Sequence, residues 1–179
     1  RQTKRTYVSG ESHYFFGKRY RLELVYKNEA PAVFLKGKNK IILQVRPKSP
    51  IAKRHEVMTE WYRKQLQPVL ENLITKWQRK IGVETSYWGI KQMKTRWGTC
   101  NHRRARVLLN LELAKKPLPC VEYVVAHELL HVIENVGVRF PSQKALDILE
   151  AHGAAVDRET SIARIPGPVV EEALATAPP

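Results

Sequence analysis

The sequence predicts an α+β fold in which a small mixed or antiparallel sheet packs on helices. Two observations support this class. The first fifty residues alternate apolar and polar side chains between turn-forming residues, which is typical of short strands. Apolar residues then recur at helical spacing from about residue 51 to residue 82, and residues 124–134 form a second stretch, largely apolar, that predicts a buried helix. At 179 residues the chain is long enough for one domain with a small addition.

Residues 6–26 predict a β-hairpin that turns at Gly17-Lys18. Its second strand places Tyr20, Leu22, Leu24 and Tyr26 on one face. Further strands are expected at 32–35 and 41–45, and the prolines at 47 and 50 then interrupt the pattern. We therefore expect a β-rich part over residues 1–50, shortened at its start.

From about Ile51 to Gly82 the spacing of apolar residues predicts a long helix, with Pro68 as a point where it is kinked or divided. The remaining positions carry many lysines and arginines. A solvated basic face explains them better than a nucleic-acid surface does. Strands are expected at 87–93 and 106–111, and the prolines at 117 and 119 suit the entry to a helix that begins near Cys120. Residues 51–135 form the expected catalytic core.

The helix over residues 124–134 contains His-Glu-x-x-His. Residues four apart lie on one face of a helix, so His127 and His131 are predicted to bind one metal ion, and imidazole suits Zn²⁺. Glu128 is placed to take a proton from water at that ion. The surrounding residues are apolar on nearly every side, which predicts a helix buried in a core.

The formal net charge of +14 favours polyanionic partners, including nucleic acid on a basic surface. Residues 136–179 carry four basic and six acidic residues, a net charge of −2, and residues 1–135 therefore carry +16. Two cysteines are too few for a disulfide framework, and no apolar run is long enough for a transmembrane helix. We expect a cytoplasmic protein with no membrane contact.

Four separated blocks resemble the YgjP-like metallopeptidase-domain family, which is related to SprT-like and other zincin metalloproteases and is often encoded beside type I restriction–modification systems. The blocks are residues 9–13, 88–100, 109–113 and 123–134. The resemblance implies a zincin-like core, with His127 and His131 as zinc ligands and Glu128 as catalytic base. It also implies that the family's opening strands are absent.

The chain departs from this family after the motif. The family has a third ligand histidine six residues beyond the second, where this chain has Gly137. Residues 136–179 are divergent, by rearrangement or by fusion: a helix is expected from Ser142 to Ala151, then an Ala/Pro-rich tail. His152 is the candidate third ligand, although a solvent-exposed role suits it better, and Glu134 could also reach the histidine face.

The segment 94–100 contains two candidate substrate-binding residues. Arg96 offers a planar fork for carboxylate or phosphate, and Trp97 offers a surface for stacking. The resemblance favours a place near the active site for both residues over simple packing.

Three functions remain open from the sequence. The first is a zinc-dependent hydrolase, by default a metallopeptidase, in which Glu128 activates water. The second is hydrolysis of a nucleoside triphosphate, which is associated with one branch of the family and suits the basic composition. The third is a catalytically impaired scaffold that binds nucleic acid or a restriction-system partner.

Overall fold

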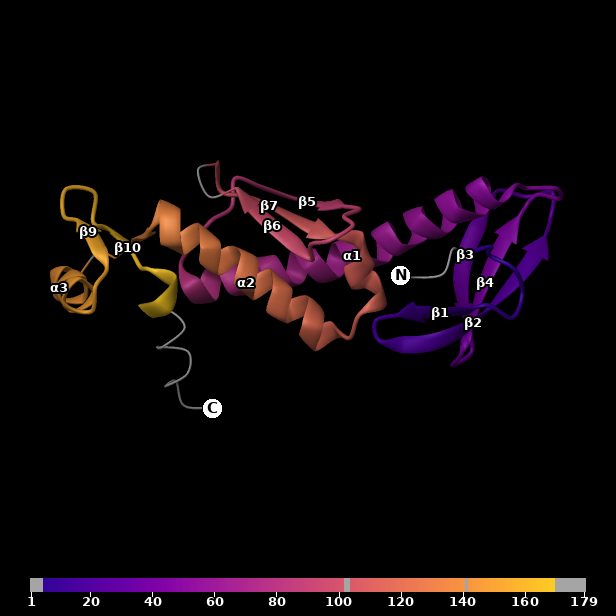
Figure 1. Cartoon of the computed structure of the whole chain (residues 1–179), viewed down its shortest axis with the longest axis horizontal. Helices are drawn as coiled ribbons and strands as arrows, with labels where there is room; N and C mark the ends of the chain where they lie inside the picture. Colours follow the sequence, from indigo (N-terminus) through magenta and orange to yellow (C-terminus); the bar gives the residue numbers. More distant parts are fainter. Residues whose placement is uncertain (1–4, 102–103, 141, 170–179) are drawn as a thin grey trace. The chain divides into compact units, whose positions relative to one another are not determined.

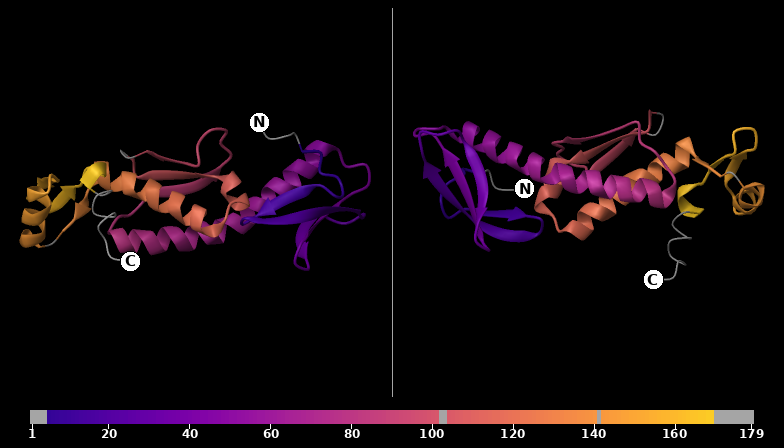
Figure 2. Two further views of the ribbon diagram at one scale, coloured as in Figure 1. Left: turned by 60° about the horizontal axis from the view of Figure 1, so that its bottom comes forward. Right: turned by 180° about the vertical axis from the view of Figure 1, so that it is seen from behind.

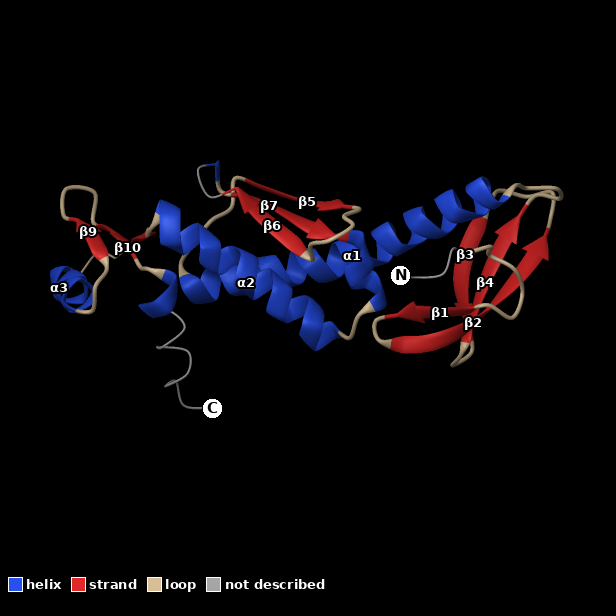
Figure 3. Ribbon diagram, in the orientation of Figure 1, coloured by secondary structure: helices blue, strands red, loops and turns tan. Residues whose placement is uncertain are grey.

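The computed structural model describes residues 5–101, 104–140 and 142–169, apart from the side chains of residues 134–136 and 139. Its helices and small mixed sheets confirm the α+β class (Figure 3). The chain forms two compact units. Unit 1 comprises Arg1–Leu70 and Leu111–Val121, and unit 2 comprises Glu71–Asn110 and Glu122–Pro179. The long helix α1 (Ile51–Ile81) contributes to both units, and the division expected at residues 50 and 135 stays a prediction.

Unit 1 contains a four-stranded sheet in the order β1-β2-β4-β3 (Figure 1). Its strands are β1 (Ser12–Phe15), β2 (Lys18–Tyr26), β3 (Ala32–Lys36) and β4 (Lys40–Val45). The expected hairpin is present as β1 and β2, joined by Phe16 and Gly17, which both have positive φ. Positive φ at both loop residues is the geometry of a tight hairpin turn. β2 pairs in parallel with β4, and β3 pairs antiparallel with β4.

The core of unit 1 lies between one face of this sheet and α1 (Figure 2). Met58, Tyr62, Leu66 and Leu70 recur every four residues and are all buried, so they form one apolar stripe. Pro68 is exposed and does not divide α1, which runs as a single helix from Ile51 to Ile81. The sheet contributes a second buried set, Leu22, Ile41, Leu43 and Val45.

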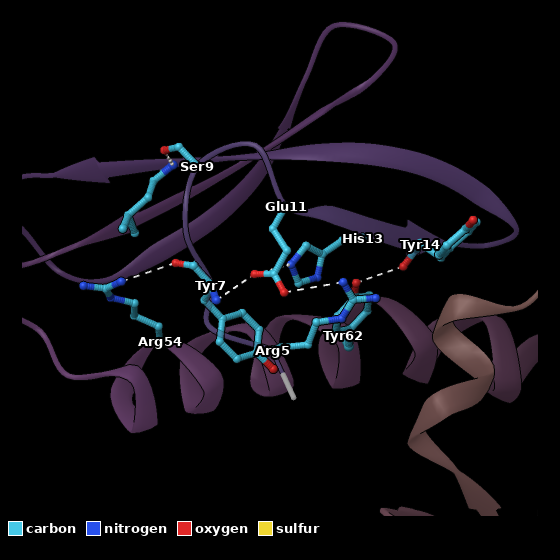
Figure 4. Close-up of polar contacts among 9 residues, drawn as sticks. Arg5, Tyr7, Ser9, Glu11, His13, Tyr14, Arg54 and Tyr62 are labelled. Atoms are coloured by element: carbon cyan, nitrogen blue, oxygen red, sulfur yellow. Dashed lines mark hydrogen bonds and ion pairs between the residues drawn. The ribbon is translucent and has the colours of Figure 1, made fainter. Parts of the chain in front are cut away.

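A polar group lies under the β1–β2 hairpin of unit 1 (Figure 4). The Glu11 carboxylate accepts hydrogen bonds from the Tyr7 backbone N–H at 2.7 Å and from Arg5 at 3.4 Å. His13 is only 4% exposed, and its Nε2 lies 3.6 Å from Glu11 Oε2 and has no hydrogen-bond partner among the described residues. Burial lowers the pKa of His13, while the charge of Glu11 opposes that shift.

Unit 2 contains a three-stranded sheet in the order β5-β7-β6, alongside helix α2 (Leu118–Val136) (Figures 1 and 2). The strands are β5 (Tyr87–Lys91), β6 (Gly98–Asn101) and β7 (Arg106–Asn110). β5 and β7 are parallel, and β6 and β7 are antiparallel. A 3-10 helix, η2 (Leu111–Lys115), precedes α2 and belongs to unit 1.

The residues after α2 form a second small sheet, which the sequence did not predict. Its strands are β8 (Val138–Arg139), β9 (Ala155–Asp157) and β10 (Ile162–Arg164), in the order β8-β10-β9. Helix α3 (Gln143–Ala151) is present as expected, and Ser142 caps it by accepting from the Ala145 N–H. Strands of two or three residues are too short to show an alternating pattern, so composition alone suggested a tail.

No helix in the described part of the chain combines the length and the apolar character that a membrane crossing needs.

Candidate metal centre

Helix α2 carries the His-Glu-x-x-His motif and has two distinct faces. Val121, Val125, Leu129 and Val132 recur at helical spacing and are at most 1% exposed, so they form the core face. His127 is exposed and His131 is half-buried. The expectation of a helix buried on nearly every side is therefore wrong. The histidines lie on the solvent side of an amphipathic helix, where an ion can reach them.

The two imidazole rings converge. Their Nε2 atoms lie 3.2 Å apart, and the rings are nearly perpendicular, with centroids at 4.6 Å. Two metal–nitrogen bonds of 2.0–2.1 Å at a tetrahedral angle place the two nitrogens about 3.3 Å apart. The pair therefore fits two neighbouring positions around a zinc ion. The same separation also suits a hydrogen bond between the rings in the appropriate tautomers.

Glu128 lies on the buried side of the motif and is 7% exposed. Burial raises the pKa of its carboxyl, and the electrostatic influence of His127, His131 and Arg96 opposes that shift. A raised pKa brings a carboxylate closer to neutral pH, where a general base is most effective. The structure therefore suits Glu128 to proton transfer.

Gly98, the first residue of β6, provides the space for that carboxyl. A Cβ atom at this position would lie 2.5 Å from both Cγ and Oε1 of Glu128, which is closer than such contacts allow. The Glu128 side chain thus packs directly on the strand backbone. In the sequence, Gly98 stands out only as part of the block 88–100 that resembles the family. Its contact with Glu128 was not predicted.

Asn110 holds the segment that precedes β6. Its side-chain Nδ2 donates to the carbonyls of Met93 at 3.0 Å and Arg96 at 2.6 Å, and its Oδ1 accepts from the Met93 N–H at 3.3 Å. Its backbone N–H also donates to the Trp97 carbonyl at 2.9 Å. Asn110 is only 3% exposed. This role of Asn110 was not predicted, although an amide side chain at the end of an apolar strand could have indicated it.

Arg96 and Trp97, the two predicted substrate-binding residues, lie on this held segment. Both are exposed, and the charge of Arg96 opposes the rise in the pKa of Glu128 that burial causes. A third exposed group, Tyr123, stacks on the His127 ring with centroids 6.1 Å apart. Tyr123 was not predicted, although it lies one helical turn before His127.

A third protein ligand is not found among the described residues, where no three His, Cys, Asp or Glu side chains could hold one metal ion. His152 is exposed at the end of α3, with its Nδ1 2.8 Å from the Ile148 carbonyl oxygen, and the structure does not bring it to the histidine pair. The side chain of Glu134 lies outside the described part.

Gly137, where the resemblance implies the third histidine of the family, has φ +84°. A Cβ atom there would overlap Ile162 Cγ2 and would lie 2.9 Å from the Ala163 carbonyl oxygen. The chain turns at this residue into the β8-β10-β9 sheet. Any larger side chain at 137 would therefore disturb this turn.

Parts of the chain are similar to known proteins. A family model described as YgjP-like, metallopeptidase domain, matches residues 1–136. A segment of 56 residues is 39% identical to trimethylamine methyltransferase MttB of Desulfitobacterium hafniense, which covers 31% of this chain and 11% of that protein. The chain thus spans about a tenth of that relative's length. No solved structure matches the chain.

Proposed function

Because the chain belongs to the YgjP-like metallopeptidase-domain family, we propose that it is a zinc-dependent hydrolase that cleaves peptide bonds. The observation that supports this proposal most is the 3.2 Å separation of His127 Nε2 and His131 Nε2 beside the buried carboxyl of Glu128. In this proposal α2 and the β5-β7-β6 sheet form a zincin-like catalytic core.

His127 and His131 would hold the metal ion through their Nε2 atoms. A bound zinc ion would supply Lewis acidity toward the substrate carbonyl and toward water. Glu128 accepts a proton from the attacking water and returns it to the leaving amine. Burial of Glu128 against Gly98 keeps the carboxyl in one position while it does so.

Arg96 and Trp97 would bind the substrate beside this carboxyl. A guanidinium pairs with carboxylate or phosphate in two parallel hydrogen bonds, so Arg96 suits a peptide carboxylate or a nucleoside triphosphate. We take peptides as the first substrate class because of the family, and nucleoside triphosphates as the second class to screen. We also propose a cytoplasmic setting, because two cysteines, Cys100 and Cys120, are too few for a disulfide framework.

The experiment combines zinc stoichiometry by elemental analysis with hydrolysis assays of the purified chain. We expect close to one zinc per chain and activity that falls about 10³-fold in Glu128→Gln, with the zinc retained. Glu122→Gln is the matched control, because Glu122 lies on the same helix but pairs with Lys76. Full activity in Glu128→Gln would show that Glu128 is not the base.

A second candidate function is binding without turnover. It is favoured by the absence of a third ligand among the described residues. Purified protein with almost no zinc and no hydrolytic activity would support it. If zinc is present, Glu134 and His152 are the first residues to replace in the search for a third ligand.

A further inference from the structure

The positive charge of the chain is concentrated in one unit. Unit 1 contains 18 Lys or Arg and 6 Asp or Glu residues, a formal net charge of +12. Unit 2, which carries the histidine pair, contains 13 basic and 11 acidic residues, a net charge of +2. The attraction for polyanions is therefore a property of the unit that holds the four-stranded sheet.

On the outer face of that sheet, a basic row crosses three adjacent strands. Arg21 on β2 pairs with Lys40 on β4, and Lys40 pairs with Lys36 on β3, so the three side chains lie on the same face. All three are exposed. Lys40 contacts Glu23 at 3.1 Å, and no ion pair is recorded for Arg21 or Lys36 with any residue that the structure describes. Strands about 4.8 Å apart space these cations evenly across the sheet.

Exposed aromatic rings flank this row at the two edge strands. Tyr14 on β1 is 46% exposed and lies two residues from Ser12, the partner of Arg21. Phe34 on β3 is 45% exposed and lies two residues from Lys36. Residues two apart in a strand share a face and lie about 6.7 Å apart. Both rings are therefore neighbours of the basic row.

The opposite face of the sheet is filled. It carries His13, Phe15, Tyr20 and Leu22, each 8% exposed or less, and Phe15 packs on Trp61 of α1 with ring centroids 4.8 Å apart. The core that packs against α1 thus uses the inner face, and Tyr14 and Phe34 lie on the outer face. Phe34 pairs there with Ile42, which is 4% exposed, but Phe34 itself remains 45% exposed beside the cations.

We propose that this outer face, formed by Tyr14, Arg21, Lys36, Lys40 and Phe34, binds single-stranded nucleic acid. Lysine and arginine attract the phosphates, and aromatic rings on a sheet stack on unpaired bases, which a duplex keeps inside its helix. The face is independent of the metal centre, so this binding requires neither zinc nor hydrolysis.

Fluorescence anisotropy with a labelled 20-nucleotide deoxythymidine strand, over a series of salt concentrations, tests the proposal on the full chain. The triple variant Arg21→Ala/Lys36→Ala/Lys40→Ala should bind at least tenfold more weakly. Its slope of log affinity against log salt should be about 2 smaller in magnitude, because each lost phosphate contact in a single strand contributes about 0.7. A control triple in unit 2, Arg79→Ala/Lys80→Ala/Lys144→Ala, removes the same charge from exposed positions and should weaken binding less than threefold.

The aromatic contribution is tested separately. Tyr14→Ala and Phe34→Ala should each weaken binding about tenfold without changing the salt slope, and Tyr14→Phe should bind like the parent protein. Glu128→Gln should also bind like the parent, so failure of the hydrolase proposal is distinguishable from failure of this one. Thermal unfolding of each variant checks that its fold is retained.

Three results would each overturn the proposal. Equal losses in the two triple variants would mean that net charge alone drives binding. Equal affinity for a duplex of the same length, with no effect of Tyr14→Ala or Phe34→Ala, would exclude base stacking. Competition by polyglutamate as strong as that by unlabelled single strand would indicate an acidic protein partner instead.

Discussion

The chain contains two histidine–glutamate groups with opposite exposure. In unit 1 the imidazole of His13 is buried, and the carboxylate of Glu11 is held by a backbone N–H and by Arg5 (Figure 4). In unit 2 the carboxyl of Glu128 is buried, and the His127 ring is exposed to solvent. The residue types are the same, so exposure decides which group can meet an ion.

The difference suits the first group to a structural role and the second group to the chemical role proposed above. A buried imidazole whose Nε2 finds no hydrogen-bond partner in the described part of the chain is costly to protonate and is closed to a ligand from solvent. A pair of solvent-facing imidazoles with converging Nε2 atoms is available to a metal ion. The predictions below compare matched changes in the two groups.

The largest contrast is expected in zinc binding. Replacing His127 with leucine should weaken zinc affinity at least 100-fold, because a single imidazole remains of the pair. His13→Leu should leave the affinity unchanged. Titration of the metal-free protein with zinc, in competition with a chromogenic chelator, measures both. A comparable loss in the two variants would mean that His13 takes part in metal binding.

For stability the order should be reversed: alanine in place of His13 should cost more than alanine in place of His127. His13→Ala removes a buried ring and leaves a cavity, which should lower the free energy of unfolding by about 2–3 kcal/mol. His127→Ala changes an exposed residue and should stay within about 0.5 kcal/mol in the metal-free protein. Urea unfolding provides both values. Equal destabilisation would contradict the exposures described above.

Replacing the carboxyl of Glu128 or of Glu11 with an amide should change Tm in opposite directions. Glu128→Gln replaces a buried carboxyl, whose pKa is raised by burial, with a neutral amide. The change should stabilise the metal-free protein by about 1 kcal/mol at pH 7, which corresponds to about 2–4 °C in Tm. Glu11→Gln weakens charge-assisted hydrogen bonds to Tyr7 and Arg5 and should lower Tm. Thermal unfolding in the presence of a chelator tests the signs, and a lower Tm for Glu128→Gln would contradict the prediction.

The smallest effect concerns pH. Burial lowers the pKa of His13 below its ordinary value of 6.5, against the attraction of Glu11, while Arg5 and Lys115 act with burial. The unfolded chain therefore binds more protons as the pH falls below 6.5, and the folded state loses stability over that range by at most about 1.4 kcal/mol per pH unit. Above pH 6.5 this contribution is fully present. His13→Leu should show a shallower decline between pH 6.5 and 5, and an unchanged slope would assign the decline to other groups.

The elements with strong local patterns could be predicted from the sequence. The β1–β2 hairpin follows from alternation around Gly17, α1 from its recurring apolar residues, and α2 from the apolar stretch around His-Glu-x-x-His after Pro117. The strands β8, β9 and β10 could not be predicted, because two or three residues carry no periodic signal and depend on one another for pairing.

The residues of the candidate site follow from the sequence, whereas their setting does not. His127, Glu128 and His131 follow from a spacing of four on one helix, and the charge of Arg96 acts on the same carboxyl. The exposure of the histidine face was not predictable, because apolar residues on both sides of the motif hide which side meets the core. The place of Gly98 beneath Glu128 depends on a contact between distant parts of the chain.

The hydrogen bonds of Asn110 also determine how the segment Met93–Trp97 moves. A connection without regular structure is ordinarily among the first regions to open, and its amides then exchange quickly with solvent. Here one side chain bonds to Met93 and Arg96, so opening requires the loss of several hydrogen bonds to β7 at once. The segment should therefore move with β7, with slow exchange at the Met93 amide. Binding of a ligand to Arg96 would therefore cost the protein little conformational entropy.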